Sequence, residues 1–319
     1  MSAGPTILAV GELLVEFVSH QKGCGLEKIS PYTGPYPSGA PAIFLDQAAL
    51  WGARTMMFGA VGDDGFGRSL VGRLERDDVG IAGISVHPHL TTGTAFVSYY
   101  ENGSRDFIFH LENTAADHFV FSPDLLPEGD LILHVSGSSL GSKRLRPQIM
   151  AAVEAVASRG GRICCDPNAR PEIMRDEEGR AALDTIIAQS FCLMPSIGDL
   201  DFLYPGLGES AAINRLLERS AELVVVKRGA EGASVISRGQ RHDIAPHGVN
   251  EIDPTGAGDG FCGAFVALLA QACPAEEAAI LANAAGALSV TRRGPMEGNA
   301  SPAEVQDFLA AQAGAGALS

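Results

Sequence analysis

The sequence predicts an α/β fold in which a mostly parallel sheet lies between two layers of helices. Short apolar strands alternate with helical segments in the second half of the chain, and two long alanine-rich helices stand near its end. Strands and helices in alternation form a parallel sheet with helices on both faces. A β-prone insertion in the first half is expected to form a small lid. We therefore expect one three-layer αβα domain over residues 1–319.

The first half of the chain contains a predicted strand, a helix and a hairpin. Thr6–Phe17 is rich in apolar and β-branched residues and is expected to form a strand, whereas Ser38–Gly52 carries apolar residues at helical spacing. Two β-prone stretches, Ala95–Tyr100 and Asp106–His110, flank an Asn-Gly pair. Because Asn-Gly favours tight turns, these stretches predict a hairpin.

The second half of the chain supplies the regular alternation. The predicted strands are Leu131–Ser136, Arg162–Asp166, Phe191–Pro195 and Leu223–Lys227, and the predicted helices are Arg146–Arg159, Ala257–Gln271 and Ala275–Thr291. We expect the residues after Gln312 to form a frayed tail, since they are mostly alanine and glycine.

Composition limits the classes of function. The formal net charge of −15 repels phosphate backbones and anionic lipids, so we expect no nucleic-acid or membrane partner. No apolar run approaches the ~20 residues that span a bilayer, and Met1–Thr6 lacks the features of a signal peptide, so a cytoplasmic location is expected. The six cysteines form no C-x-x-C pair and are expected to be reduced and buried.

The segment Asp253-Pro254-Thr255-Gly256-Ala257-Gly258-Asp259 carries the clearest chemistry. It leads directly into a predicted helix, whose first N–H groups lack intrahelical partners and carry partial positive charge. The small residues Gly256, Ala257 and Gly258 allow a phosphate to approach the backbone closely. A carboxylate beside such an anion site, here Asp259, suits a base that deprotonates a hydroxyl attacking a phosphoryl group.

Two other interpretations of this segment stay open on the residues alone. Asp259 is also explained as a favourable acid in a first helical turn. Gly258, Gly260 and Gly263 satisfy the G-x-G-x-x-G pattern of dinucleotide-dependent oxidoreductases, although a proline-containing polar segment precedes them and only about sixty residues follow. The chain contains no G-x-x-x-x-G-K-[ST], which excludes a P-loop.

The segment D-x-T-G-A-G-D-x-F resembles the C-terminal signature of ribokinase-like (PfkB) sugar kinases. Six further segments resemble that family in the same order: Gly11–Glu16, Ser38–Ala42, Gly59–Gly67, Asp166–Arg170, Val226–Ala233 and Ala282–Ala287. The resemblance implies a ribokinase-like fold and an ATP-dependent phosphotransferase that uses Mg²⁺. It also implies a lid formed by about residues 12–38 and 92–112, through which relatives often form homodimers.

By the same resemblance, Asp259 takes the proton of the sugar hydroxyl, and the backbone of Gly256, Ala257 and Gly258 forms the anion hole. Asp253 and Thr255 match positions that hold a monovalent cation such as K⁺ in several relatives. The Mg²⁺-positioning N-x-x-E element of the family corresponds to Ser196-Ile197-Gly198-Asp199, in which only Asp199 retains the acid.

The resemblance also assigns ligand contacts. The sugar is expected to contact Glu16, Gly39, Ala40, Tyr99 and Arg170, and the nucleotide to contact Lys227, Gly229, Gly232 and Asn283. Several of these residues have a plainer explanation: Glu16 as a solvated acid, Tyr99 and its neighbour Phe107 as cross-strand packing, Arg170 as a surface ion pair, Gly229 and Gly232 as ordinary turn residues, and Asn283 as a helix-surface amide.

Two departures from the family pattern bear on substrate. Ile43 stands where relatives have a sugar-binding Asn, and Phe109-His110-Leu111 lacks the Arg of relatives that act on sugar acids. We therefore predict phosphorylation of a primary hydroxyl on a neutral sugar, a ketohexose such as fructose or tagatose. The alternatives are 2-keto-3-deoxygluconate or a nucleoside as substrate, and a catalytically silent sugar or nucleotide sensor. Retention of Asp259 argues against the sensor.

Overall fold

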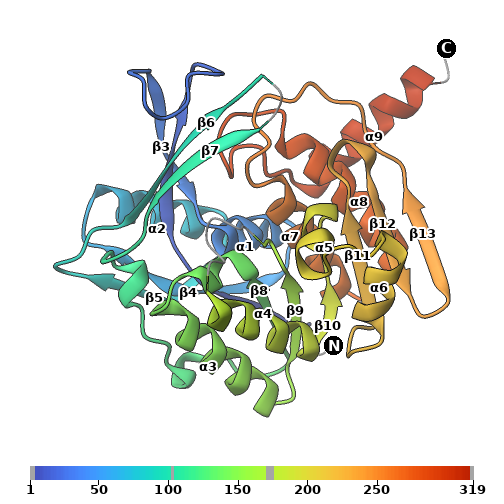
Figure 1. Cartoon of the computed structure of the whole chain (residues 1–319), viewed down its shortest axis with the longest axis horizontal. Coiled ribbons are helices and arrows are strands. Elements are labelled where there is room, and N and C mark those ends of the chain that lie inside the picture. Colours follow the sequence, from blue (N-terminus) through green and yellow to red (C-terminus); the bar gives the residue numbers. More distant parts are fainter. Residues whose placement is uncertain (1–3, 102–103, 170–175, 317–319) are drawn as a thin grey trace.

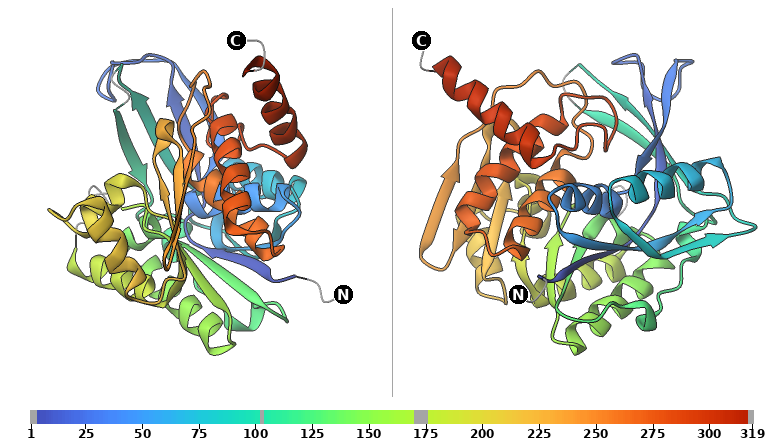
Figure 2. Two further views of the ribbon diagram at one scale, coloured as in Figure 1. Left: turned by 90° about the vertical axis from the view of Figure 1, so that its right-hand side faces the viewer. Right: turned by 180° about the vertical axis from the view of Figure 1, so that it is seen from behind.

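The computed structural model describes residues 4–101, 104–169 and 176–316. Two sheets organise this part of the chain (Figure 1). The main sheet has the strand order β13-β12-β11-β10-β9-β8-β1-β4-β5, and the smaller sheet, the lid, has the order β3-β2-β6-β7. The predicted αβα fold is confirmed, because helices cover both faces of the main sheet (Figure 2).

The main sheet is parallel from β5 to β11 and ends in the antiparallel strands β12 and β13. Its strands are β1 (Thr6–Val10), β4 (Arg54–Gly62), β5 (Gly80–His87), β8 (Leu131–Ser136), β9 (Arg162–Asp166), β10 (Ser190–Leu193), β11 (Leu223–Lys227), β12 (Ala233–Ser237) and β13 (Gln240–Ile244). Ligands bind such sheets beyond the carboxyl ends of the strands. Here those ends face the lid (Figure 1).

Each face of the main sheet has its own helices and its own hydrophobic cluster. One face packs against α1 (Ala40–Leu50), α2 (Gly65–Arg76), α7 (Ala257–Ala270), α8 (Ala275–Ser289) and α9 (Pro302–Gly316). The other packs against α3 (Leu145–Ser158), α4 (Glu177–Gln189), α5 (Ile197–Leu203) and α6 (Glu209–Leu217). Short 3-10 turns occur at η1 (Ala116–His118), η2 (Pro123–Leu125), η3 (Gly137–Gly141) and η4 (Gly229–Glu231).

The lid consists of β2 (Leu14–Ser19), β3 (Tyr32–Ser38), β6 (Gly93–Tyr99) and β7 (Arg105–His110). Strands β6 and β7 pair antiparallel, which confirms the predicted hairpin. Along β7, residues 105, 107 and 109 are half-buried whereas residues 106, 108 and 110 are exposed. One face of this strand therefore turns toward the body of the molecule, as expected from the alternation of side chains along a strand.

Two sequence-based predictions about elements are wrong. The stretch Thr6–Phe17 is divided between β1 in the main sheet and β2 in the lid. The chain changes sheets after Gly11, where a Cβ atom would lie 2.7 Å from Pro41 and 2.8 Å from Ser139, so a side chain does not fit at this crossing. The tail after Gln312 continues as helix α9 to Gly316. Among the described residues, no helix combines the length and the apolar character needed to cross a membrane.

Candidate active site at the head of helix α7

Helix α7 begins directly above the carboxyl ends of the central strands. Gly256 is its N-cap and has left-handed backbone angles, φ 80° and ψ −9°. A Cβ atom at Gly256 would lie 2.3 Å from the carbonyl oxygen of Pro295, so this tight entry accepts only glycine. Ala257, Gly258 and Asp259 form the first turn, whose N–H groups face the space above the sheet as the end of any helix does.

The Asp259 carboxylate lies where two cavities meet, and both are lined by Gly256 and Asp259. The Asp259 side chain is buried, and the Nδ2 atom of Asn168 lies 3.5 Å from its Oδ1 atom. Asn168 follows β9 and has a positive φ of 35°. This arrangement allows one carboxylate to face a group in each cavity, with an amide donor beside it.

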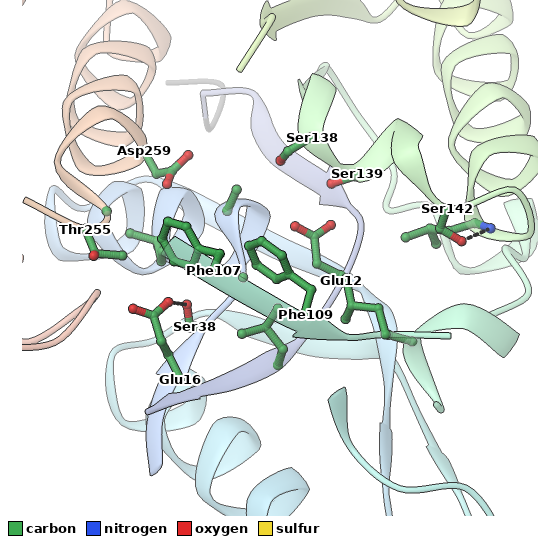
Figure 3. A pocket seen from close by; sticks show the side chains of 18 of the residues that line it. Glu12, Glu16, Ser38, Phe107, Phe109, Ser138, Ser139, Ser142, Thr255 and Asp259 are labelled. Carbon is green, nitrogen blue, oxygen red and sulfur yellow. Dashed lines mark hydrogen bonds between the residues drawn. The ribbon is translucent and has the colours of Figure 1, made fainter. Parts of the chain in front are cut away.

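The first cavity lies between the lid and the main sheet and is acidic (Figure 3). Among the described residues that line it, every charged side chain is an acid: Glu12, Glu16, Asp117 and Asp259. Glu16 is 3% exposed, and its Oε2 atom accepts a hydrogen bond of 3.3 Å from the Ser38 hydroxyl. The rings of Phe107 and Phe109, both from β7, form an apolar wall. Carboxylates beside aromatic rings suit a ligand that carries several hydroxyl donors on an apolar ring.

The second cavity is larger, about 740 Å³. It extends from Asp259 along the carboxyl ends of β9 and β11 to helix α8. Its walls include Gly229, Gly232, Asn283 and the segment Pro246–Val249. Gly232 has a φ of 89° and lies so close to Ile244 that a Cβ atom would be 2.1 Å from its carbonyl oxygen. The size and the glycine-lined walls suit a nucleotide whose phosphates point toward the head of α7.

A buried ion pair lies next to the first turn of α7. The Nζ atom of Lys227 forms a short contact with the Asp166 carboxylate and lies 3.6 Å from the Sγ atom of Cys262. Burial alone would lower the pKa of Lys227, but the adjoining Asp166 carboxylate outweighs burial and raises the pKa. Lys227 therefore stays protonated. Its Nζ atom is 3.4 Å from the position of a Cβ atom on Gly258, so its charge lies next to the first turn of α7.

Ser196 and Asp199 form a capping box at the start of α5. The Asp199 Oδ2 atom accepts hydrogen bonds of 2.7 Å from both the backbone N–H and the hydroxyl of Ser196, and its Oδ1 atom accepts one of 2.7 Å from the Ala169 N–H. Asp199 lines the second cavity. The substitution of Ser196 for the family Asn therefore preserves the helix start, and Asp199 also fixes the chain beside Asn168.

The side chains of Asp253 and Thr255 contact the lid. The Tyr99 hydroxyl donates a 2.6 Å hydrogen bond to Asp253 Oδ1 and contacts the Thr255 hydroxyl. Asp253 Oδ1 also accepts from the Thr255 N–H at 3.0 Å, and Oδ2 accepts from the Gly294 N–H at 3.0 Å. In this arrangement protein donors occupy the side-chain oxygens that the sequence suggested for a monovalent cation.

No group of three or more His, Cys, Asp or Glu side chains that could hold a metal ion occurs within the described ranges. The second cavity nevertheless offers separate carboxylates, Asp166, Asp199 and Asp259, near the head of α7. Such oxygen donors fit Mg²⁺ that arrives on nucleotide phosphates and keeps several waters.

The family model of the pfkB carbohydrate kinases matches residues 5–302. This chain belongs to the PfkB family of carbohydrate kinases. It is accordingly an ATP-dependent carbohydrate kinase with a ribokinase-like fold.

Several relatives of this PfkB kinase are similar over nearly their whole length. A structure with ATP and Mg²⁺ from E. coli, provisionally assigned as ribokinase II, is 40% identical with a TM-score of 0.90, covering 96% of this chain and 99% of the other. The fructokinase of Vibrio cholerae O395, solved with fructose, ADP and calcium, is 26% identical with a TM-score of 0.83, covering 97% and 100%. The fructokinase of Vibrio alginolyticus is 31% identical, covering 86% and 91%.

The PfkB kinase brings most of the predicted site residues to the two cavities. Of the sugar-binding set, Glu16, Gly39 and Ala40 line the first cavity; of the nucleotide-binding set, Lys227, Gly229, Gly232 and Asn283 line the second. The Asn283 amide donates a 2.9 Å hydrogen bond to the Ala245 carbonyl, so it holds the cavity wall. Tyr99 lines neither cavity, and its hydroxyl bonds to Asp253 instead. Arg170 lies outside the described residues.

Sequence reasoning missed several residues that line the site. Glu12 belongs to the segment that carries Glu16, and its place two residues beyond the end of β1 could have identified it. Asn168 stands in the D-x-N-x-R segment, of which only Arg170 was predicted to contact a ligand. Arg105 lines the second cavity from the lid, on the same face of β7 as Phe107. The sequence predicts that Arg105 and Phe107 lie on the same face of the strand. It does not predict that the lid approaches the second cavity.

Proposed function

We propose that this kinase transfers the γ-phosphoryl group of ATP to a primary hydroxyl of a ketohexose, fructose or tagatose. The observation that carries the proposal is the position of Asp259, with the anion-binding turn of α7, on the wall shared by an acidic cavity and a nucleotide-sized cavity. A sugar hydroxyl in the first cavity and a phosphate in the second would meet at this carboxylate.

The charge of the first cavity supports a neutral sugar. Glu12, Glu16 and Asp117 accept hydrogen bonds from hydroxyl groups, but they would repel the carboxylate of a sugar acid. Ile43 lines the same cavity in place of an amide, so polar recognition comes from the acids and from Ser38, Ser138 and Ser139. The fructose-bound V. cholerae fructokinase shares this fold, which supports a ketohexose.

In the proposed reaction, Asp259 accepts the proton of the attacking hydroxyl as the oxygen bonds to the γ-phosphorus and ADP leaves. Asn168, 3.5 Å from Asp259 Oδ1, orients the carboxylate. The N–H groups of the first turn of α7 and the nearby charge of Lys227 stabilise the negative charge that spreads over the transferring group. Phe107 and Phe109 keep water out of the sugar cavity.

Mg²⁺ would be held mainly by the phosphates of ATP, with Asp199 and Asp166 the nearest carboxylates for its waters. Once bound, Mg²⁺ offsets phosphate charge during transfer. The ATP and Mg²⁺ of the E. coli relative support this assignment.

The test is ADP release with Mg-ATP against fructose, tagatose, 2-keto-3-deoxygluconate, ribose and adenosine. We expect turnover on a ketohexose at least about tenfold above the others in kcat/KM, the discrimination that one or two hydrogen-bonding groups provide. Preferred turnover of 2-keto-3-deoxygluconate would contradict the neutral-sugar assignment. ATP binding without turnover on any sugar would favour the sensor.

The outer face of the lid supports a homodimer, which we also propose. Phe17 stacks on Phe96 with ring centroids 5.1 Å apart, and Tyr32 meets Phe96 edge-on at 6.0 Å. Ile108 on the same sheet is 44% exposed. A second copy could cover these apolar side chains. Light scattering should give twice the 33.2 kDa mass of the chain, and a monomer at micromolar concentration would contradict the dimer.

A further inference from the structure

One lid hydroxyl lies deep inside the molecule, at the loop that precedes α7. Tyr99 is the last residue of β6 and is 7% exposed. Its hydroxyl donates to Asp253 Oδ1 at 2.6 Å and contacts Thr255. Asp253 is 1% exposed and stands three residues before Gly256, the N-cap of α7. The bond therefore joins two parts of the chain that are 154 positions apart.

Asp253 is the point at which three segments meet. Its carboxylate accepts hydrogen bonds from Tyr99, from the Thr255 N–H and from the Gly294 N–H. Gly294 has a φ of 108° and lies against a second lid tyrosine, because a Cβ atom there would be 2.7 Å from the Tyr36 ring. Gly256 in turn is closed in by the carbonyl of Pro295. The lid therefore contacts both loops that shape the entry to α7. Tyr99 contacts the loop of Asp253, and Tyr36 contacts the loop of Gly294.

The same lid also closes the sugar cavity. Glu16 on β2 and Phe107 on β7 line that cavity, and the Tyr99 ring packs with Val18, Val97, Tyr36 and Phe107. A ligand that contacts β2 and β7 in this cavity would therefore affect the position of Tyr99, because Tyr99 packs directly against residues of both strands. Burial, followed by the neighbouring Asp253 carboxylate, raises the pKa of Tyr99, so its hydroxyl keeps its proton and remains a donor.

We propose that the Tyr99 hydroxyl is a positioning group for phosphoryl transfer: it ties the sugar-covering lid to the loop that carries the anion hole and Asp259. When the lid sits over the sugar, the bond to Asp253 fixes the loop in the geometry that transfer requires. When the bond is absent, the loop and Asp259 are set less accurately, and water competes better with the sugar hydroxyl. This inference rests on the proposed role of Asp259 and its loop.

The test compares Tyr99→Phe with Tyr100→Phe. The first removes only the buried hydroxyl and retains the ring. The second removes the hydroxyl of the adjacent tyrosine, which bonds to Asp106 within the lid and does not reach the loop. Both variants are measured for ADP release with the neutral sugar that the wild type prefers and for ADP release without sugar. The ratio of the two rates is the readout, because a mere loss of folded enzyme lowers both rates equally.

We expect Tyr99→Phe to lower the ratio about tenfold or more, the effect of losing one hydrogen bond to a charged group, with the KM for ATP nearly unchanged. Tyr100→Phe should keep the wild-type ratio. A Tyr99→Phe ratio within about twofold of the wild type, or an equal fall in Tyr100→Phe, would overturn the proposal. Asp259→Asn, measured in the same assay, separates this inference from the proposed function. If Asp259→Asn stays active, the proposed role of Asp259 is wrong. If Asp259→Asn is inactive and Tyr99→Phe behaves as the wild type, only the positioning role of Tyr99 is wrong.

Discussion

Glu16 is a single acid whose surroundings differ from those of an ordinary surface carboxylate. A glutamate is normally solvated, but Glu16, within β2, is 3% exposed and shares a cavity with Glu12 and Asp259. Its Oε2 atom accepts a hydrogen bond from the Ser38 hydroxyl, and an ionised carboxylate has about four lone-pair sites in all. We expect such a carboxylate to accept a hydrogen bond from a sugar hydroxyl.

Glu16→Gln should therefore weaken sugar binding while it preserves the shape of the side chain. We expect the sugar KM to rise about tenfold, because a charge-assisted hydrogen bond becomes a neutral one. The KM for ATP should stay unchanged, since Glu16 does not line the second cavity. Glu112→Gln is the matched control, because Glu112 is exposed just beyond β7. An unchanged sugar KM in steady-state assays would remove Glu16 from the sugar site.

At the residue scale, the sequence predicted the residues of the head of α7 better than those of the lid. Gly256, Ala257, Gly258 and Asp259 are consecutive along the chain, so a local pattern is enough to identify them. Tyr99 could be placed on a hairpin but not oriented, since its partner Asp253 lies 154 positions away. Arg105 was missed for the same reason. Contacts between distant segments depend on how the lid packs on the body, which no local pattern encodes.

The elements around the site depend on packing at a few unusual positions. The entry to α7 needs a left-handed residue with no side chain, and Gly256 satisfies both demands. The ring of Phe44 in α1 stacks on His134 of β8, with centroids 3.7 Å apart and planes inclined by 9°. His134 is 1% exposed and lies in the middle of the main sheet. Each position leads to a prediction about its element.

Gly256→Ala should damage both the start of α7 and catalysis. The added Cβ atom would meet the Pro295 carbonyl at 2.3 Å, and the left-handed backbone disfavours alanine. We expect a loss of about 1–3 kcal/mol in the free energy of unfolding in urea, with turnover reduced about 10²-fold as the anion hole distorts.

The control for this substitution is Gly72→Ala on α2, where a Cβ atom has open space and the backbone is helical. There we expect an unchanged or slightly higher free energy of unfolding, by at most about 1 kcal/mol. If the Gly256 variant matched this control in stability and turnover, the geometry described for the helix entry would be wrong.

His134 should make the main sheet sensitive to mild acid. Burial, followed by the charge of Lys227, lowers the pKa of His134 to about 3 from its ordinary 6.5. As the pH falls below 6.5, this histidine binds a proton in the unfolded chain but not in the folded protein. The free energy of unfolding therefore decreases between about pH 6.5 and 3. The loss from this histidine between pH 7 and pH 5 should be about 2 kcal/mol.

His134→Leu tests this account by urea unfolding at both pH values. We expect a smaller loss of stability between pH 7 and pH 5 in the variant, whatever its stability at pH 7. The exposed-histidine variant His89→Leu should lose as much as the wild type. Equal losses in wild type and His134→Leu would contradict the assignment of the acid sensitivity to this side chain.

The elements themselves were largely predictable. Strands β8, β9 and β11 coincide with the predicted ranges, because short apolar runs between helical segments are characteristic of buried parallel strands. The division of Thr6–Phe17 was not predictable, since both halves have the composition of buried strands and only the crossing at Gly11 separates them. Helix α9 was missed because its alanine- and glycine-rich end resembles a loose tail.

At the scale of the whole molecule, the arrangement of sheet and lid produces the site. The carboxyl ends of the parallel strands provide Asp166 and Asn168, α7 provides its first turn with Asp259, and the lid provides Glu16 and Phe107. The net charge of −15 is compatible with nucleotide binding, because the dipole of α7 and the nearby Lys227 would act at short range on a phosphate at the helix start, whereas distant surface charges are screened. The alternation of elements predicted this architecture, but the way in which the lid meets α7 required the structure.

The measurement that tests the central claim most directly is sugar-dependent ADP release by the wild type and Asp259→Asn, with ATP binding measured separately. We expect the wild type to turn over a ketohexose and the variant to lose about 10²-fold or more in kcat while it binds ATP nearly as well, since only the base is removed. Asp124→Asn, an exposed acid in η2, should behave as the wild type. Near-wild-type turnover in Asp259→Asn would contradict the account, because no other described carboxylate lines both cavities.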